Sequence, residues 1–451
     1  MDQALAGWLF VGMTFMLMLG FPVAFTLLGT SLVFGVIGFG WDFFNLMPLR
    51  VWGVMSNFTY TAVPLFIFMG MAMERSGIAT KLIESMGTML GRVRGGMAIS
   101  VVLVGALLGA STGIVGATVV TMGLLALPTM MRCGYKNTLS TGVIAASGTL
   151  GQIIPPSIIL ILLGDIIGVP VGDLFIGALV PGFMLVLFYI IYIMIYSKVW
   201  PENVPAVTCA PKCKPGDPGY DACALDPDMP SMRDLMAAFL PPLFLILAVL
   251  GTIFAGIASP TEAAGVGAFG ALILSYVNGK FSWQMLKEVM ESTMRLTSMI
   301  FIILVGATAF GLVFRGLGGD HLVREFVQTL PFGKWGVLAI VMFLIFLMGF
   351  FLDFIEITFI QIPVLAPIMI ESGFDPTWLA LIFALNLQTS FLTPPFGFSL
   401  FYLKGVCPPQ VSTLDIYKGI IPFVLIQLLV LGICAAFPDL LLWLPQMAAA
   451  R

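Results

Sequence analysis

Two pairs of adjacent prolines stand inside long apolar stretches of the sequence. Pro155-Pro156 follows Gly151-Gln152, and Pro394-Pro395 follows Ser390-Phe391. Proline has no N–H and clashes with the carbonyl four residues earlier in a helix, so each pair is expected to break its helix and to free two carbonyls. Unpaired carbonyls are costly inside a membrane. A bound alkali cation would satisfy them.

Hydroxyl side chains surround both proline pairs and offer further oxygen atoms. They belong to Ser147, Thr149, Ser157, Thr389, Ser390 and Thr393. Oxygen donors suit hard cations rather than zinc or copper, and we expect sodium rather than protons because the two regions hold almost no titratable groups. The alternative is that each pair only kinks a helix, with water or Ser and Thr side chains satisfying the freed groups.

An acidic side chain, Asp353, also lies within an apolar stretch, and an acid inside a membrane is a functional candidate. The alternative is a solvated carboxylate at the mouth of a hairpin. Glu356 would share its helix face, and we assign it no role. The two acids could in principle serve acid–base chemistry, but no nucleophile or set of metal ligands accompanies them, so an intramembrane enzyme is the weaker hypothesis. Glu262 follows Pro260-Thr261 and is typical of the first turn of a helix.

The composition indicates a polytopic membrane protein. Of 451 residues, 59% are hydrophobic and 10% charged, against roughly 45–50% and about 25% in an average soluble protein. The mean hydropathy is +1.07. A net charge of -3 disfavours a nucleic-acid partner, and the single histidine, His321, leaves little scope for histidine-based metal or acid–base chemistry.

The apolar runs predict an all-helical chain. A membrane span needs about 20 apolar residues, and ten runs fit this length: 4–20, 22–40, 58–74, 136–165, 174–197, 234–256, 262–278, 296–314, 376–403 and 417–444. Two further runs, 95–131 and 334–371, are too long for one crossing. The first is interrupted at residues 110–113 and the second by the two acids. We expect both to form re-entrant hairpins whose tips face protein or a wet cavity.

The distribution of positive charge predicts the orientation. With ten crossings, one face collects 15 of the 20 Lys and Arg residues and the other collects 5, so the first face is expected to be cytoplasmic. Both termini would then be periplasmic, and the polar loop 201–233 cytoplasmic. Cys209, Cys213 and Cys223 lie in this loop. We expect free thiols there, because three cysteines without a nearby histidine match no standard zinc pattern. The first residues lack the positive segment of a signal peptide, so the first run is expected to remain a span.

The two halves of the chain are weakly similar. A shift of 239 positions places residues 151–157 on 390–396 and brings the two interrupted runs together. In the predicted topology the halves run in opposite directions, as in transporters built from inverted repeats. Chance similarity between apolar, proline-containing helices is the alternative. The predicted divisions are a first repeat, 1–200, with hairpin 95–131 and broken helix 136–165; the loop 201–233; and a second repeat, 234–451, with hairpin 334–371 and broken helix 376–403.

Several segments resemble a known family over essentially the whole chain. They include GASTGIVGATVV (109–120), AASGTLGQIIPPSIILI (145–161), SPTEAAGVGA (259–268), GFFLDFIEI (349–357) and LTPPFGFSLFYLKGV (392–406). These segments are similar to the large, DctM-like membrane subunit of TRAP transporters, the tripartite ATP-independent periplasmic family. The resemblance implies a sodium-driven importer of organic acids in the bacterial inner membrane that works by an elevator mechanism. Its implied partners are a small four-helix DctQ-like membrane subunit and a periplasmic solute-binding protein, and it implies no cofactor besides sodium as the coupling ion.

The resemblance also implies the ligands of two sodium sites. The first site would use Ser111, Thr112 and Gly113 with Ser147, Gly148, Thr149 and Gly151. The second would use Thr261, Ser390, Thr393 and Phe396, with Asp353 near one of the two sites. The chain departs from the family pattern at Ser390, where glycine is usual, and at Phe396, where a smaller residue is usual.

Two matters of function stay open at this stage. The long 201–233 loop is similar to that of a branch associated with mannitol or chloroaromatic compounds, whereas the wider family carries C4-dicarboxylates and sugar acids. A self-sufficient sodium–dicarboxylate symporter of related architecture is the nearest rival, because it would need no binding protein. The chain has no Gly-x-x-x-x-Gly-Lys-Ser/Thr phosphate loop, as expected for transport without nucleotide.

Overall fold

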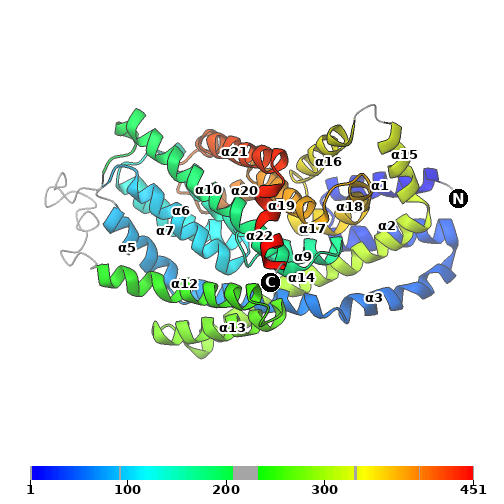
Figure 1. Ribbon diagram of the computed structural model, residues 1–451, viewed down its shortest axis with the longest axis horizontal. Coiled ribbons are helices and arrows are strands. Elements are labelled where there is room, and N and C mark those ends of the chain that lie inside the picture. Colours follow the sequence, from blue (N-terminus) through cyan, green and yellow to red (C-terminus); the bar gives the residue numbers. More distant parts are fainter. Residues whose placement is uncertain (1–2, 91–92, 207–231, 330–332, 396, 450–451) are drawn as a thin grey trace.

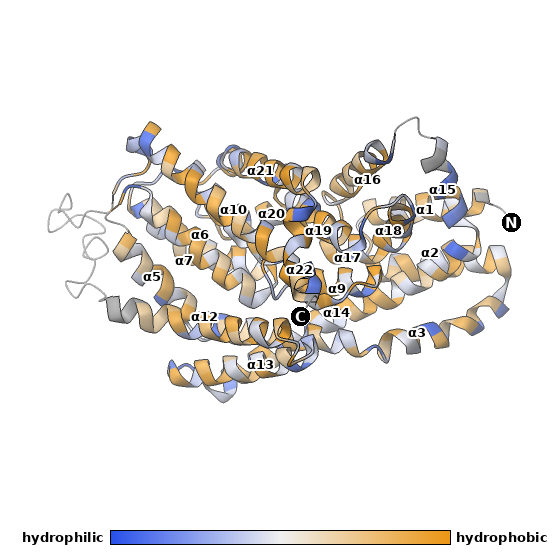
Figure 2. Ribbon diagram, in the orientation of Figure 1, coloured by the Kyte–Doolittle hydropathy of each residue, from blue (hydrophilic) through white to orange (hydrophobic). Residues whose placement is uncertain are grey.

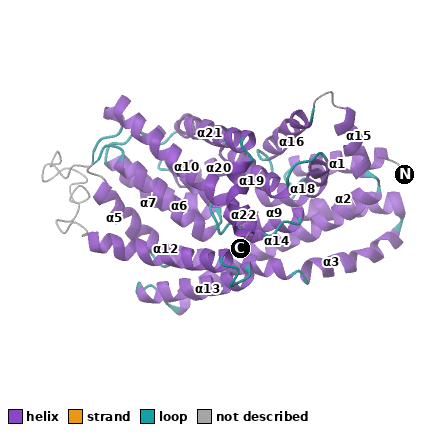
Figure 3. Cartoon of the chain, viewed as in Figure 1, coloured by secondary structure: helices purple, strands orange, loops and turns teal. Residues whose placement is uncertain are grey.

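The computed structural model describes residues 3–90, 93–206, 232–329, 333–395 and 397–449. These parts of the chain are helices joined by short loops and contain no strand (Figure 3). The prediction of an all-helical protein is therefore confirmed. The three cysteines of the 201–233 loop and Phe396 lie outside the described residues.

The helices follow one another with few long connections. The first half contains α1 (Gln3–Met18), α2 (Val23–Phe39), η1 (Trp41–Leu46), α3 (Met47–Met55), η2 (Phe58–Thr61), α4 (Ala62–Arg75), α5 (Ile78–Leu90), α6 (Gly96–Thr112), α7 (Val115–Arg132), α8 (Asn137–Thr149), η3 (Leu150–Gln152), α9 (Ile158–Ile167), α10 (Val171–Val199) and η4 (Pro201–Asn203). The second half contains α12 (Met232–Phe254), α13 (Pro260–Val277), α14 (Trp283–Gly316), α15 (Gly319–Thr329), α16 (Lys334–Met348), α17 (Phe354–Ile360), α18 (Ile362–Glu371), α19 (Pro376–Leu392), α20 (Phe398–Val406), α21 (Thr413–Ala436) and α22 (Asp439–Ala449).

The helices form two packed groups. In the flanking group, which comprises α1 to α5 and α12 to α15, α4 packs on α13 and α14, and α2 packs on α14. In the core group, which comprises α6 to α10 and α16 to α22, α8 packs on α6, α7 and α21. Figure 1 shows α3, α12, α13 and α14 along one long edge, with α10, α16 and α21 along the other. The groups meet chiefly where α4 and α5 contact α6 and where α14 contacts α17.

Burial separates the outer helices from the central ones. Large apolar side chains are exposed on outer helices, among them Phe183, Phe244 and Phe269, and Figure 2 shows apolar residues along most ribbons. By contrast, every residue from 139 to 149 in α8 and from 378 to 392 in α19 is buried. Apolar side chains that face lipid need no cover, whereas polar groups in a buried helix need partners within the protein. The helices α8 and α19 therefore form the centre of the molecule.

The predicted spans correspond to helices, with four additions. The short helices α3, α5, α15 and α22 were not predicted, because a search for runs of about 20 apolar residues passes over helices of this length. Helix α14 begins at Trp283 instead of residue 296, because Ser282 accepts a hydrogen bond from the Met285 N–H and caps a polar extension. By length and composition, five described helices can cross a membrane, or seven if each of two bent pairs is one span.

The two predicted hairpins differ in the way their arms pack. In the first, α6 lies against α7, and the turn is made at Gly113, whose φ of 60° favours glycine. In the second, α16 packs mainly on α19, whereas α17 and α18 pack on α9. The returning arm of this second run, which stays a predicted re-entrant hairpin, bends by 57° between α17 and α18, where Pro363 stands in the first turn of α18 and cannot continue the hydrogen bonding of α17.

Candidate functional site

The first proline pair breaks a buried helix at the predicted place. Helix α8 ends at Thr149, a single short turn, η3, follows, and α9 begins only at Ile158. The Pro155-Pro156 peptide bond is cis. The Ser157 hydroxyl donates a hydrogen bond of 2.5 Å to the Gln152 carbonyl. The chain is therefore non-helical for several residues in the interior of the core group.

The second proline pair has the same effect at the corresponding place. Helix α19 ends at Leu392 and α20 begins at Phe398, with a cis bond between Pro394 and Pro395. The Ser399 hydroxyl donates to the Phe391 carbonyl at 2.9 Å. Phe391 stands 239 positions after Gln152, so the equivalent carbonyl is held by a serine hydroxyl at both breaks.

These hydrogen bonds correct the expectation that the freed carbonyls lack partners. The carbonyls of Gln152 and Phe391 accept serine hydroxyls, and the Ser390 carbonyl accepts the Thr393 N–H at 3.1 Å. Side chains of the protein therefore satisfy two of the four freed carbonyls, and a backbone N–H satisfies a third. Each carbonyl oxygen has a second lone pair, so these bonds leave room for a cation ligand.

The structure packs the arms of the first hairpin against the α8 residues predicted for the first site. Helix α6 crosses α8 and η3 so closely that a Cβ at Gly109 would lie 2.6 Å from the Gly151 nitrogen, and one at Gly105 would lie 2.6 Å from Ser147 Cβ. A Cβ at Gly148 would meet Val119 of α7. Glycine is required at this crossing because two backbones approach one another. The α6 arm of the first hairpin therefore lies directly on the first break.

The tip of the first hairpin is held by polar contacts and by the flanking group. The Thr112 and Thr118 hydroxyls lie 2.8 Å apart, and the Ser111 hydroxyl donates to the Leu108 carbonyl. Gly70 of α4 lies against the backbone of residues 111 and 112, because a Cβ there would lie 2.8 Å from the Ser111 carbonyl oxygen. The predicted ligands Ser111, Thr112 and Gly113 therefore lie where the core group meets α4.

The second break is covered by the second interrupted run. A Cβ at Gly349 would overlap the Ser390 side chain, and the rings of Phe354 and Phe391 have centroids 5.6 Å apart. Asp353 lies between Gly349 and Phe354 in the chain and is therefore beside the second break. The Thr393 hydroxyl donates to the Thr389 carbonyl at 2.7 Å.

The two acids of this region have a local structural role. The Asp353 carboxylate accepts the Phe354 N–H at 2.6 Å, and the Glu356 carboxylate accepts the Asp353 N–H at 3.0 Å. This reciprocal capping box satisfies N–H groups at the start of α17. Glu262 forms the same kind of box with Ser259 at the start of α13, which confirms its interpretation as a first-turn acid.

Thr261 is not placed where the resemblance implied. It lies in the first turn of α13, with its hydroxyl 3.4 Å from that of Ser259. The main packing partners of α13 are α4, α12 and η2, and neither α19 nor α20 is among them. Thr261 therefore belongs to the flanking group, and the structure does not bring it to the second break.

Three buried amides near the breaks were missed by sequence analysis. Gln152 and Gln388 are fully buried, and neither the amide nitrogen nor the amide oxygen of either has a hydrogen-bond partner. Gln427 is 2% exposed, and its oxygen also lacks a partner. An amide within an apolar run was the signal available in the sequence. Such groups are costly unless water, an ion or a ligand pairs with them.

The donor set favours a hard monovalent cation. Within the described ranges, no group of three or more His, Cys, Asp or Glu residues could hold a metal ion. Carbonyl, hydroxyl and amide groups belong to both breaks, and the Asp353 carboxylate lies beside the second. Neutral oxygen donors fit sodium or potassium better than a transition metal.

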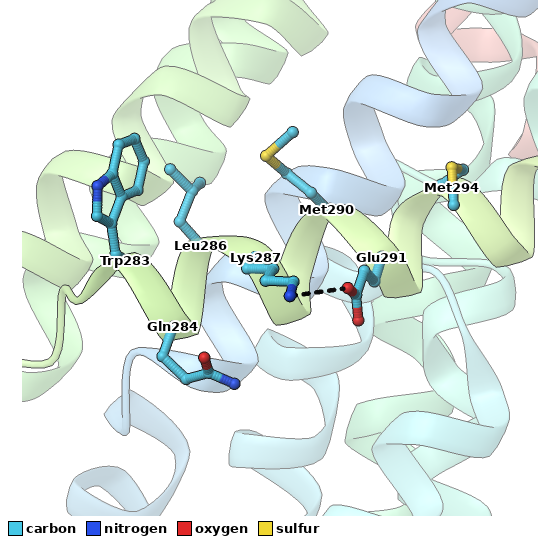
Figure 4. Close-up of a pocket in the computed structure, with 7 residues that line it drawn as sticks. All are labelled: Trp283, Gln284, Leu286, Lys287, Met290, Glu291 and Met294. Atoms are coloured by element: carbon cyan, nitrogen blue, oxygen red, sulfur yellow. Dashed lines mark ion pairs between the residues drawn. The ribbon is translucent and has the colours of Figure 1, made fainter.

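A shallow groove on the outer face of α14 lies apart from both breaks. It has a volume of about 500 Å³, and residues of α14 alone line it, from Trp283 to Met294 (Figure 4). Lys287 and Glu291 form an exposed ion pair of 3.8 Å within it. A groove made by a single helix face encloses nothing, so the breaks, and not this groove, form the candidate site.

Comparison with known proteins places the chain among membrane permeases. Residues 10–440 match the family described as the tripartite ATP-independent periplasmic transporter, DctM component. A C4-dicarboxylate TRAP transporter large permease protein from Pseudomonas aeruginosa is 30% identical over 424 residues, which cover 93% of each chain. An ectoine TRAP transporter large permease protein from Halomonas elongata is 30% identical over 96% of this chain and 97% of its own. The corresponding sialic acid protein from Vibrio cholerae is 26% identical over 99% of each.

A solved structure shares the fold. The YdaH transporter of Alcanivorax borkumensis superposes with a TM-score of 0.60 over 95% of this chain and 99% of its own, at 14% identity. At this level of identity the likeness concerns the fold alone.

The contact between Gly349 and Ser390 generates a prediction about the second break. A Gly349→Ala change should lower the free energy of unfolding by about 1–3 kcal/mol, because the added methyl overlaps the serine side chain. In the Ser390→Gly background the same change should cost less, because the overlapping atoms are gone. Thermal unfolding in detergent measures both effects. Gly432→Ala is the control, since nothing lies within 4 Å of that position. Equal losses in both backgrounds would contradict the described contact.

Proposed function

We propose that this chain, which belongs to the DctM component family of the tripartite ATP-independent periplasmic transporters, imports an organic acid by coupling its entry to that of sodium. The family consists of membrane permeases rather than enzymes. What we propose for this chain is the coupling ion, the class of substrate and the transport mechanism. The observation that carries them is the pair of broken helices, α8–α9 and α19–α20, buried at the centre of the core group.

Two buried breaks are suited to sodium coupling for a physical reason. Non-helical backbone is tolerated at membrane depth only where it lies within protein or lines a wet cavity. The breaks provide hydroxyl and carbonyl oxygens, such as those of Ser147, Thr149, Ser390 and Thr393, without a charged donor set. A cation entering such a site also gains about 2.3 kcal/mol per elementary charge for each 100 mV of membrane potential that it crosses. Sodium entry could thus drive accumulation of the acid.

The packing of the two halves supports an inverted repeat. In the first half, α7 packs on α20, which follows the break of the second half. In the second half, α17 and α18 pack on α9, which follows the break of the first. The first arm of each interrupted run packs on its own broken helix, α6 on α8 and α16 on α19. We propose that this exchange reflects two repeats of opposite orientation, as in other secondary transporters.

Movement of the core group against the flanking group would deliver the substrate. Several described polar contacts join the two groups. The Asn57 amide donates to Asp165 of α9 at 2.8 Å, and the Thr121 hydroxyl of α7 donates to Glu74 of α4 at 2.5 Å. Arg324 of α15 pairs with Glu371 of α18 at 2.8 Å, and Arg315 of α14 donates to the Pro363 carbonyl at 3.4 Å. These contacts would have to break if the whole core group slid along the flanking group. We therefore propose an elevator mechanism in which α4 forms part of the fixed surface.

Partners and substrate follow from the family. The relatives named above are permeases for C4-dicarboxylate, ectoine and sialic acid. An isethionate relative from Oleidesulfovibrio alaskensis is named DctMQ, and the match covers 63% of its length. We propose a separate four-helix DctQ-like subunit and a periplasmic solute-binding protein as partners. We place both termini of this chain in the periplasm and the 201–233 loop in the cytoplasm of an inner-membrane protein.

The contact between α4 and α7 generates a prediction about movement. In a background in which the six native cysteines are replaced by serine, the pair Glu74→Cys and Thr121→Cys should be bridged by a short bis-methanethiosulfonate reagent, which joins each thiol through a reducible disulfide. Bridging should abolish uptake, and reductant should restore it, because the two groups could no longer move apart. The control pair, Ala72→Cys with Ser275→Cys, joins α4 to α13 within the flanking group. Uptake that persists after complete bridging of the first pair would exclude relative movement at this contact.

Reconstitution tests the proposed function as a whole. Proteoliposomes that contain this chain with its small subunit should accumulate the acid only with the binding protein present and with an inward sodium gradient. A potassium or choline gradient of equal size should not support uptake. Uptake by this chain alone, without the binding protein, would favour the self-sufficient symporter. Uptake that ignores the sodium gradient would overturn sodium coupling.

A further inference from the structure

A buried amide links two long helices to the first break. Gln427 of α21 donates from its amide nitrogen to the Tyr189 hydroxyl of α10 at 2.9 Å and to the Thr149 hydroxyl at 3.4 Å. Tyr189 and Thr149 are fully buried. The Thr149 hydroxyl in turn donates to the Ala146 carbonyl at 2.8 Å. The amide thus extends a hydrogen-bonded chain from α10 through α21 to α8.

The hydrogen bonds that hold Thr149 act on the first break because of where Thr149 lies. Thr149 is the last residue of α8, and the non-helical segment starts directly after η3. Helix ends inside a protein depend on side chains to fix their last carbonyls. Because Gln427 holds the Thr149 side chain, it fixes the direction in which α8 presents its final turn to the break.

The second break is tied to α21 in a different way. The Tyr417 hydroxyl of α21 donates to the Pro395 carbonyl within the break at 2.9 Å. Gln388 occupies the position 239 residues after Thr149, and its amide nitrogen and oxygen are both buried without a hydrogen-bond partner. The two breaks therefore share backbone geometry but differ in support, since a described amide holds the end of the broken helix only at the first.

We infer that Gln427 is a positioning residue for the first cation site, which it stabilises by holding Thr149 while remaining outside the coordination shell. The inference rests on the proposed sodium coupling. It assigns unequal roles to the two breaks, because loss of Gln427 weakens cation binding at the first and leaves the second unchanged. It also explains why a polar side chain is buried where α21 packs on α8.

The test measures the sodium dependence of uptake by the assembled transporter in proteoliposomes. Gln427→Met keeps the length of the side chain and removes its hydrogen bonds. We expect the sodium concentration for half-maximal uptake to rise about three- to tenfold, the worth of a typical buried hydrogen bond, while the rate at saturating sodium stays within about threefold of wild type. Thr149→Val removes the same bond together with a hydroxyl oxygen of the proposed site, so its half-maximal sodium concentration should rise at least as far, and adding Gln427→Met to it should cause no further increase.

The matched control is Tyr189→Phe, which removes the partner of Gln427 that does not contact the break. Its sodium dependence should stay close to that of wild type. An unchanged half-maximal sodium concentration in Gln427→Met, or equal shifts in Gln427→Met and Tyr189→Phe, would overturn the inference and indicate a packing role. A wild-type transporter without sodium dependence would instead overturn the proposed function, and this inference with it. If Gln427→Met does not assemble, Gln427→Asn, whose shorter side chain withdraws the amide from Thr149, carries the test, and an unshifted value there overturns the inference.

Discussion

A helix that breaks within a membrane must find new partners for its backbone polar groups, because lipid offers none. This constraint determines where α8 and α19 lie. Both are buried along almost their whole length, both are surrounded by other helices of the core group, and each has a serine hydroxyl on the equivalent carbonyl at its break. The outer helices, whose backbone bonds are complete, are free to expose phenylalanine and other apolar side chains to lipid.

Close packing of the interrupted runs on the breaks follows from the same constraint. The backbones of Gly109 and Gly151 lie directly on one another, and Gly349 lies on the Ser390 side chain. The second arms also reach the other half, since α7 packs on α20 as well as on α8, and α18 packs on α9. Each break is therefore positioned partly by the other half. This interdependence makes movement of the core group as a unit more plausible physically than movement of a single helix.

Sequence analysis predicted the features that depend on local chemistry. Proline cannot continue a helix, so the ends of α8 and α19 were predictable, as was the interruption of both long runs. The capping role of Glu262 followed from its place after Ser259-Pro260. The rule that each proline frees the carbonyl four residues earlier did not predict the new partners of those carbonyls. Ser399 lies eight residues after Phe391, and only the folded chain shows that its hydroxyl reaches the Phe391 carbonyl.

Features that depend on distant packing were not predictable in this way. Thr261 carries the right side chain but lies on α13, among flanking helices. The amide of Gln427 is 278 residues from Thr149 in the chain, and no pattern in either segment indicates the contact. The helices on which the arms of the second interrupted run pack, α19 for α16 and α9 for α17 and α18, lie outside it in the chain, and α9 belongs to the other half. Polar groups in apolar runs are the one local signal that would have drawn attention to these positions.

The central claim is that each proline break creates an oxygen-lined cation site. Equilibrium binding of radioactive sodium to the purified chain in detergent, with potassium as competitor, tests it most directly. The account predicts saturable binding at one site per break, with loss of one site when Pro155 and Pro156 are replaced by alanine and of the other when Pro394 and Pro395 are replaced. Absence of saturable sodium binding, or binding that survives both replacements in a folded chain, would contradict it.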